Sequence, residues 1–187
     1  MIYLLGTRHY VQWKWDNPGP QLLAKFDRFA KYIADSVRKN TIAAIAEETN
    51  HETDKAKGTQ SIAKFIAEGM KPPLYYLPCE PSSEERSALG ILTADEITNN
   101  ARLTDGALQQ YRDAEILKYF PPREKYWIER LRRLPLRPVL FICGANHIQT
   151  FFPRLIDNGM PSQVISSDWC ESDDNEYRPL PIEERPI

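Results

Sequence analysis

Cysteine is scarce in this sequence, and long apolar runs are missing. The three cysteines are Cys79, Cys143 and Cys170, and no two of them are spaced as Cys-x-x-Cys. This pattern argues against a disulfide framework and against a zinc ribbon, and it favours a reducing, cytoplasmic environment. The longest apolar runs are far shorter than the roughly 20 residues that cross a bilayer, so we expect no membrane span.

An excess of positive charge is also missing. Lysine and arginine number 24 against 26 aspartate and glutamate residues, which gives a formal net charge of −2. Nucleic acid is therefore not expected as the partner, because binding it requires cations that neutralise phosphates. A small molecule or a peptide is the expected substrate. The sequence has no basic and apolar leader after Met1 and no Gly-x-Gly-x-x-Gly or Walker cradle, so we expect no signal peptide and no nucleotide cofactor. Nothing in it predicts an oligomeric state.

The composition is that of one globular domain. The chain has 187 residues, of which 42% are hydrophobic and 27% are charged, and a chain of this length can bury a single substantial core. We predict one α/β domain over residues 1–168. Residues 169–187 are acidic and rich in proline, which predicts an irregular tail.

Short apolar runs predict the strands of a mainly parallel central sheet. The first, Ile2 to Leu5, stops at Gly6, and the second, Ile42 to Ala46, is apolar throughout, as strands covered on both faces are. Further strands are expected at residues 73–77, 138–143 and 163–166.

Apolar residues spaced by three and four predict helices that flank this sheet. The longest runs from Gln21 to about Lys39, and others are expected at residues 61–70, 84–89 and 147–159. Between the third and fourth strands, helical periodicity recurs at residues 95–103, 107–119 and 123–134. This helical segment either covers the sheet or forms a cap over the site.

Two of the three histidines share an unusual context. His9 and His147 each follow a glycine by three residues, Gly6 and Gly144, and each glycine ends an apolar run. With 8 glycines in 187 residues, two of three histidines would meet this condition by chance about half a per cent of the time. His51 lies in the polar stretch 49–52 and is expected to be a loop residue and not a ligand.

Parallel strands end at one edge of their sheet, and this edge is where open α/β sheets bind ligands. Glu47 and Glu48 end the second predicted strand and reach the same edge as His9 and His147. Two imidazoles and a carboxylate suffice to hold a catalytic Zn²⁺, Mn²⁺ or Fe²⁺ ion, and they suffice equally for acid–base catalysis without a metal. Taken singly, each histidine could instead be a capping or packing residue, and each glutamate a solvated charge at a strand end.

The two turns supply further candidates for substrate binding: Gly6, Arg8, Gly144 and Asn146. Backbone N–H groups that precede a helix favour an anionic group, although Asn146 could equally be only the N-cap of that helix.

Arg123 and Cys143 are less distinctive. Arg123, near the start of its helix, is a candidate to stabilise a developing oxyanion, or else it is an exposed helix arginine. Cys143 directly precedes a turn, but its place in an apolar strand favours a buried residue over a nucleophile.

The motifs resemble those of the TraB/PrgY/TIKI family, within the erythromycin esterase-like, ChaN-like and TIKI superfamily. Leu-Leu-Gly-Thr-Arg-His at 4–9 and Cys-Gly-Ala-Asn-His at 143–147 are similar to its paired Gly-x-x-His motifs. The strand that ends in Glu47 and Glu48 resembles its glutamate strand, and Arg123 with Trp127 resembles its arginine helix. The four motifs occur in the family's order over residues 2–157. The chain lacks the anchor of membrane-associated members, and the adjacent glutamates leave the position of the key glutamate open by one.

The resemblance implies a compact α/β fold with a His/Glu site formed by His9, Glu47 or Glu48, Arg123 and His147. In TIKI-type members it implies metal-dependent protease activity. Our first hypothesis is a metal-dependent, peptidase-like or esterase-like hydrolase in which Zn, Mn or Fe is bound by the histidines and a glutamate. Two alternatives are a non-catalytic module that binds a small ligand, an anion or a haem-like iron species, and a metal-free acid–base hydrolase.

Overall fold

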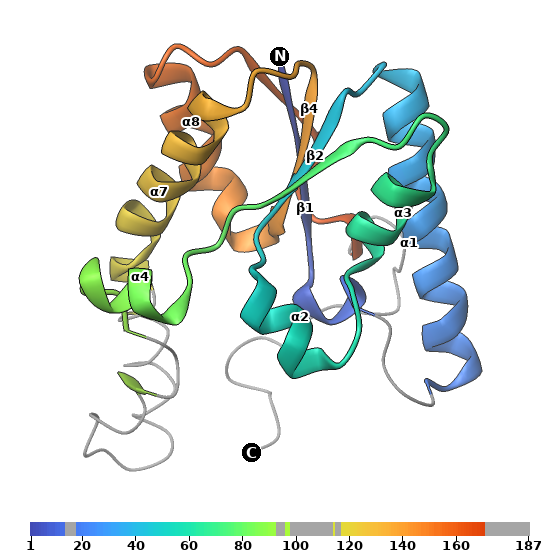
Figure 1. Ribbon diagram of the computed structural model, residues 1–187, viewed down its shortest axis with the longest axis horizontal. Helices are drawn as coiled ribbons and strands as arrows, with labels where there is room; N and C mark the ends of the chain where they lie inside the picture. Colours follow the sequence, from blue (N-terminus) through green and yellow to red (C-terminus); the bar gives the residue numbers. More distant parts are fainter. Residues whose placement is uncertain (14–17, 93–95, 98–113, 115–116, 171–187) are drawn as a thin grey trace.

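The computed structural model describes residues 1–13, 18–92, 96–97, 114 and 117–170. Its centre is a five-stranded sheet in the order β3-β2-β4-β1-β5, in which every pairing is parallel. Helices cover both faces of this sheet (Figure 1). The predicted fold class, a single α/β domain with a mainly parallel sheet flanked by helices, is confirmed.

All five predicted strands are present, with ends that differ from the predicted ones by at most two residues. They are β1 (Ile2–Thr7), β2 (Ala44–Glu47), β3 (Tyr75–Pro78), β4 (Val139–Gly144) and β5 (Ser162–Ser166). Every residue of β4 is buried, because β4 lies between β2 and β1 and has helices on both faces. This position explains why its sequence is apolar without alternation.

One face of the sheet is covered by α1 (Pro20–Lys39) and α3 (Ile62–Gly69). Phe26, Phe29 and Ile33 of α1 pack there on Ile45 and Leu140. The other face is covered by α7 (Phe120–Arg133) and α8 (Ile148–Asp157), whose Trp127 and Phe151 contact Phe141. No helix within the described residues has the length and apolar character needed to cross a bilayer.

Two short helices, α2 (His51–Lys57) and α4 (Ser83–Ala88), lie at the edge where the strands end (Figure 1). The prediction of a loop at His51 was wrong, because His51 is the first residue of α2. Asn50 caps this helix by accepting a hydrogen bond from the Thr53 N–H, and Gly58 ends it at a φ of 67°. Capping and charge form α2 without an apolar face, so periodicity could not detect it.

α4 lies where a helix was predicted at residues 84–89, and α7 is the main described part of the helical segment predicted between the third and fourth strands. α7 begins at Phe120, before the predicted start at Arg123, because Pro121 and Pro122 fit the first turn of a helix. Most of the stretches predicted at 95–103 and 107–119 lies outside the described residues. Trp169 and Cys170 are buried against α1, so the packed domain extends past the predicted boundary at Asp168. The predicted tail from residue 171 onward is also outside the described residues.

Candidate functional site

The strand order brings the two Gly-x-x-His turns together. β1 and β4 are neighbours, with Gly6 opposite Cys143 and Thr7 opposite Gly144. The chain leaves β1 towards α1 on one face of the sheet, whereas it leaves β4 towards α8 on the other. Such a reversal opens a crevice at the carboxyl ends of two adjacent strands. The first turn continues into η1 (His9–Val11) and the second into η2 (Ala145–His147), so both histidines lie at this crevice.

Glu48 is the centre of the site. It follows β2, which pairs with β4 on the side opposite β1. Its Oε1 lies 3.8 Å from His9 Nε2 and 3.5 Å from His147 Nε2, and it accepts a hydrogen bond of 2.5 Å from Arg123 Nη2. Its Oε2 accepts a bond of 2.7 Å from the Gly144 N–H. An anionic group was expected at the turn after β4, and the anion that the Gly144 N–H binds there is the carboxylate of Glu48.

These neighbours keep Glu48 ionised although it is buried. Burial alone would raise the pKa of its carboxyl group. The charges that His147 and His9 carry when protonated, the charge of Arg123 and the Gly144 N–H outweigh burial and lower this pKa to about 2. Glu48 therefore carries a fixed negative charge at physiological pH.

Each histidine presents its Nε2 to Glu48 because its Nδ1 is occupied. His9 Nδ1 lies 3.0 Å from Gln12 Oε1, and His147 Nδ1 lies 2.9 Å from Glu124 Oε1. Both acceptors favour a proton on Nδ1, which leaves the Nε2 lone pair free. Glu124 is itself held, since it also accepts from Thr150 and forms an ion pair of 2.8 Å with Arg154.

Arg123 clamps two carboxylates. Besides Glu48, it binds Glu80, which follows β3, through Nε and Nη2 at 2.9 Å each. Trp127 Nε1 donates to the same Glu80 carboxylate at 3.1 Å. Burial alone would lower the pKa of Arg123, but the charges of Glu48 and Glu80 outweigh burial and raise it. Its Nη1 lies 3.4 Å from His147 Nε2, so the guanidinium joins all the charged groups of the site.

Glu47, predicted as an alternative to Glu48, lies apart from this cluster. It is the last residue of β2 and shares its face with Ile45, which packs with α1 and α3. Its Oε2 accepts hydrogen bonds from Ser61 at 2.5 Å and Tyr76 at 2.6 Å, and its buried Oε1 has no partner among the described residues. Burial raises its pKa to about 7, against the lowering effect of these two hydrogen bonds.

This raised pKa gives a prediction for Glu47→Gln. A carboxyl whose pKa is higher in the folded chain than in the unfolded one stabilises the fold below about pH 4.5 and loses that contribution as the pH rises through about 7. Urea denaturation would measure the free energy of unfolding of both proteins. From pH 5 to pH 8 this free energy should rise for Glu47→Gln, relative to the parent, by on the order of 2 kcal/mol. The glutamine oxygen can still accept from Ser61 and Tyr76. Equal pH slopes for parent and variant would contradict a neutral, buried Glu47.

The glycines of the two turns are needed for close packing. A Cβ on Gly6 would lie 2.1 Å from the Ser167 carbonyl oxygen, which is backbone and cannot easily move. A Cβ on Gly144 would lie 2.9 Å from His9 Nε2 and 3.4 Å from Glu48 Oε2. Gly144 thus leaves the space into which the reactive end of His9 fits, and Gly6 permits β1 to approach the chain after β5.

The structure gives the other predicted substrate-binding residues, Arg8 and Asn146, different surroundings. Arg8 pairs with Asp168, with Nε to Oδ2 at 2.7 Å. Asn146 is exposed within η2, and the N-cap of α8 is His147, so Asn146 is not that cap. Cys143 is fully buried, and burial raises the pKa of its thiol well above the usual value, which disfavours a thiolate nucleophile.

A cavity of about 500 Å³ gives access to one side of the cluster. His9, Glu48, Glu80 and Arg123 line it, and the remaining lining residues are aromatic, cationic or polar: Tyr10, Trp13, Thr53, Lys57 and Arg86. The His9 side chain is 58% exposed, whereas that of His147 is 3% exposed and stacks on Phe120 at 3.7 Å between ring centroids. Of the two histidines, His9 is therefore the one that a substrate or water can reach.

The side chains as arranged do not fit the predicted divalent metal. The guanidinium of Arg123 lies on the Glu48 oxygen that both histidines face, and a second cation at that oxygen would be repelled. Within the described ranges, no group of three or more His, Cys, Asp or Glu side chains is arranged to hold a metal ion. Binding of Zn, Mn or Fe by His9, His147 and Glu47 or Glu48 stays a prediction.

Three important residues were not predicted as site residues. Glu80 follows β3 at the same edge as Glu48, and the strand-end reasoning that found Glu48 would have found it. Glu124 is a buried carboxylate one residue after Arg123. The signal in the sequence that could have indicated it is an acidic residue on the apolar face of a helix. Gln12, which contacts His9, has no comparable signal in the sequence.

No family model, curated protein or solved structure matches this chain. The resemblance to the TraB/PrgY/TIKI family therefore rests on the four motifs and stays a prediction. Chemical inference has to begin from the geometry of the site.

Proposed function

We propose that this protein is a hydrolase in which His9 is the general base and Glu48 the carboxylate that stabilises its charged form. The observation that carries this proposal is the convergence of two Nε2 atoms from neighbouring strands on one buried, ionised carboxylate oxygen. A base whose other ring nitrogen is held by an acceptor, beside a fixed negative charge, is the arrangement that acid–base catalysis requires.

The reaction would use His9 twice. Its Nε2 takes a proton from a water molecule in the cavity while the water oxygen attacks the carbonyl carbon of an ester or amide. The negative charge then passes to the carbonyl oxygen, where the positive charge of Arg123 favours it. Collapse of the tetrahedral intermediate breaks the bond to the leaving group, which receives the proton from His9. The products are a carboxylic acid and an alcohol or amine.

His147 and Glu80 have positioning roles in this proposal. His147 is too buried to reach substrate, but it contacts both Glu48 and Arg123. Glu80 fixes the guanidinium from the opposite side. Lys57 and Arg86 line the same cavity as His9, which favours a substrate that carries a negative charge near the bond to be cleaved.

The adjacent glutamates offer a matched experiment. The parent, Glu48→Gln and Glu47→Gln would be assayed on activated esters and short peptides, with and without a carboxylate near the scissile bond. We expect turnover by the parent and Glu47→Gln, and a loss of about 100-fold or more in kcat/KM for Glu48→Gln. Circular dichroism would check that each variant folds.

The same assay tests the predicted metal. We expect activity to survive a chelator and elemental analysis to find no stoichiometric metal. Near-stoichiometric Zn, Mn or Fe, with activity lost on chelation, would favour the metal-dependent hydrolase instead. Ligand-induced stabilisation without turnover of any substrate would favour the non-catalytic binding module.

A further inference from the structure

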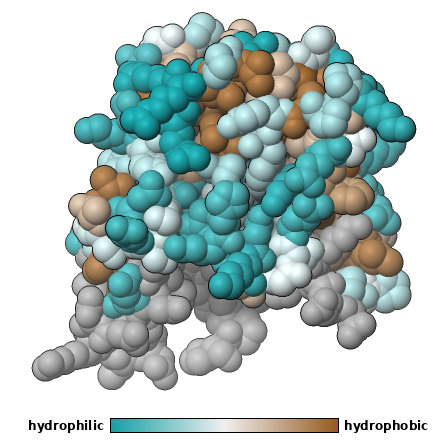
Figure 2. Space-filling model, in the orientation of Figure 1, coloured by the Kyte–Doolittle hydropathy of each residue, from teal (hydrophilic) through white to brown (hydrophobic). Residues whose placement is uncertain are grey.

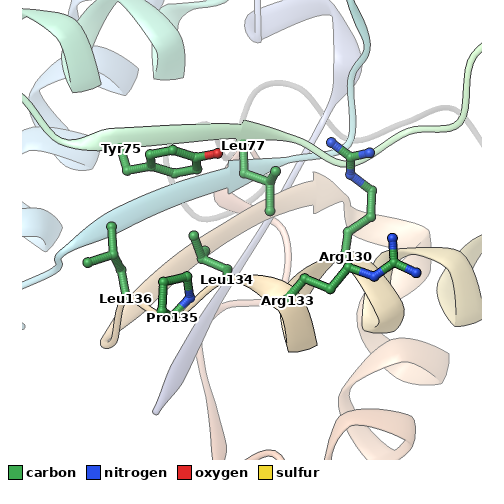
Figure 3. A pocket seen from close by; sticks show the side chains of 7 residues that line it. All are labelled: Tyr75, Leu77, Arg130, Arg133, Leu134, Pro135 and Leu136. Carbon is green, nitrogen blue, oxygen red and sulfur yellow. The ribbon is translucent and has the colours of Figure 1, made fainter.

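A second cavity, of about 410 Å³, lies away from the site and shares no lining residue with it. Tyr75 and Leu77 of β3 form one wall, and residues 134–136, which follow α7, form the other (Figure 3). Arg130 and Arg133 of α7 lie together at one end. The cavity is therefore an apolar slot with a cationic end.

The slot exists because β3 is the outermost strand of the sheet. Tyr75 and Leu77 project on the same side of β3, towards the face that α7 and α8 cover over the central strands. Because α7 ends at Arg133, it leaves these side chains partly uncovered. Tyr75 is 52% exposed and Leu136 is 39% exposed. Figure 2 shows hydrophobic side chains gathered in the upper part of the molecule as viewed, near the height at which α7 ends in Figure 1.

The wall after α7 is held in place by Arg137. Its Nη1 donates to the Leu134 and Leu136 carbonyl oxygens at 2.7 Å each, and its Nη2 donates to the Leu131 carbonyl oxygen at 2.8 Å. These bonds tie residues 134–136 to the last turn of α7, and they place a positive charge where the helix dipole is negative. This wall of the slot is thus held in place by hydrogen bonds within the chain.

The two arginines at this end have no carboxylate partner in the part of the chain that the structure describes. Neither forms an ion pair with a described residue, and the buried Nε of Arg130 has no hydrogen-bond partner in the described chain. Arg130 Nη1 reaches only the Tyr126 hydroxyl, at 3.4 Å, and the nearby Glu85 carboxylate is itself bound by that hydroxyl at 2.7 Å. An incoming anion would therefore meet two guanidinium groups at this end of the slot that no described carboxylate binds.

We propose that this slot binds a small amphipathic carboxylate. Its apolar chain would lie between Tyr75 and Leu77 on one side and Leu134 to Leu136 on the other, and its carboxylate would accept hydrogen bonds from Arg130 and Arg133. A carboxylate has one charge and two acceptor oxygens, which match two guanidinium groups among otherwise apolar walls. Such a ligand is a short fatty acid or a molecule with the same two parts.

Octanoate is a suitable probe, with acetate and octanol as controls that each lack one part. Each compound would be titrated into the full chain, and binding would be measured by calorimetry and by amide NMR shifts. Octanoate should bind more tightly than either control. We expect Arg133→Gln, an exposed position, to weaken octanoate binding about tenfold, and the double variant with Arg130→Gln to weaken it further. Leu136→Trp should also weaken it, because the larger ring fills the slot.

The matched control is Arg132→Gln, an exposed arginine of the same helix that binds Glu129 and Asn158 and does not line the slot. It should bind octanoate within twofold of the parent. Unchanged affinity in Arg133→Gln and in Leu136→Trp would overturn the proposal, as would equal affinity for octanol and octanoate. His9→Ala should bind octanoate like the parent, so failure of the proposed hydrolase and failure of this site are distinguishable.

Discussion

His9→Ala should lose about 10²- to 10⁴-fold in kcat/KM for any ester or peptide that the parent hydrolyses, while its thermal stability changes little. The imidazole supplies the only proton acceptor that we assign to the attacking water. Its side chain is more than half exposed and contributes little buried surface, so the fold should tolerate its removal. Steady-state kinetics and a thermal melt would be measured on the same preparation.

His51→Ala is the matched control for this variant. His51 is exposed at the start of α2 and does not line the cavity. It should retain the activity of the parent. If His9→Ala keeps its activity within about threefold, His9 is not the general base, whatever Glu48 contributes.

Arg123→Met should destabilise the fold by about 3 to 5 kcal/mol, because it leaves the buried carboxylates of Glu48 and Glu80 without their shared cation. Methionine keeps much of the side-chain volume, so the loss reports charge more than packing. Urea denaturation would measure it. Arg132→Met, in the same helix but exposed, removes only surface interactions and should cost less than about 1 kcal/mol.

The cost of Arg123→Met should depend on pH in a definite direction. In the parent, the lowered pKa of Glu48 contributes stability that is present above about pH 4.5 and is lost as the pH falls towards about 2. Without Arg123, one of the charges that offset burial is gone, so the pKa of Glu48 rises above its value in the parent and protonation relieves part of the cost. The difference in free energy of unfolding between variant and parent should therefore become smaller as the pH falls from 7 towards 4. A constant difference would show that Arg123 acts through packing.

Much of the site follows from one feature of the sequence, the pairing of an apolar run with Gly-x-x-His. Because parallel strands end at the same edge, the sequence predicts that His9, His147 and the glutamate pair share that edge, and the structure brings His9, His147 and Glu48 together. The strand order was not predictable in the same way. The strand order depends on which face of the sheet each long connection covers, and no single segment of the sequence determines this.

The choice between Glu47 and Glu48 shows the limit most clearly. Side chains alternate along a strand, so one of the two must share the face of Ile45 and the other must not. The sequence contains this alternation, but both faces of the strand are apolar, so it does not tell which face leads to the site. Only the packing of Ile45 with α1 and α3 shows that Glu47 lies away from the site. Glu47 then finds Ser61 and Tyr76, whereas Glu48, beyond the strand, reaches the crevice.

The position of β4 between β2 and β1 has a consequence for how the site is assembled. Residues 1–92 supply His9, Glu48 and Glu80, but their strands β1 and β2 have no hydrogen-bonded contact until β4, from the second half of the chain, lies between them. The same strand also leads into Gly144 and His147. Contacts so distant in sequence form late and together, so a partly folded chain has no partial site, and catalysis would report completion of the whole fold.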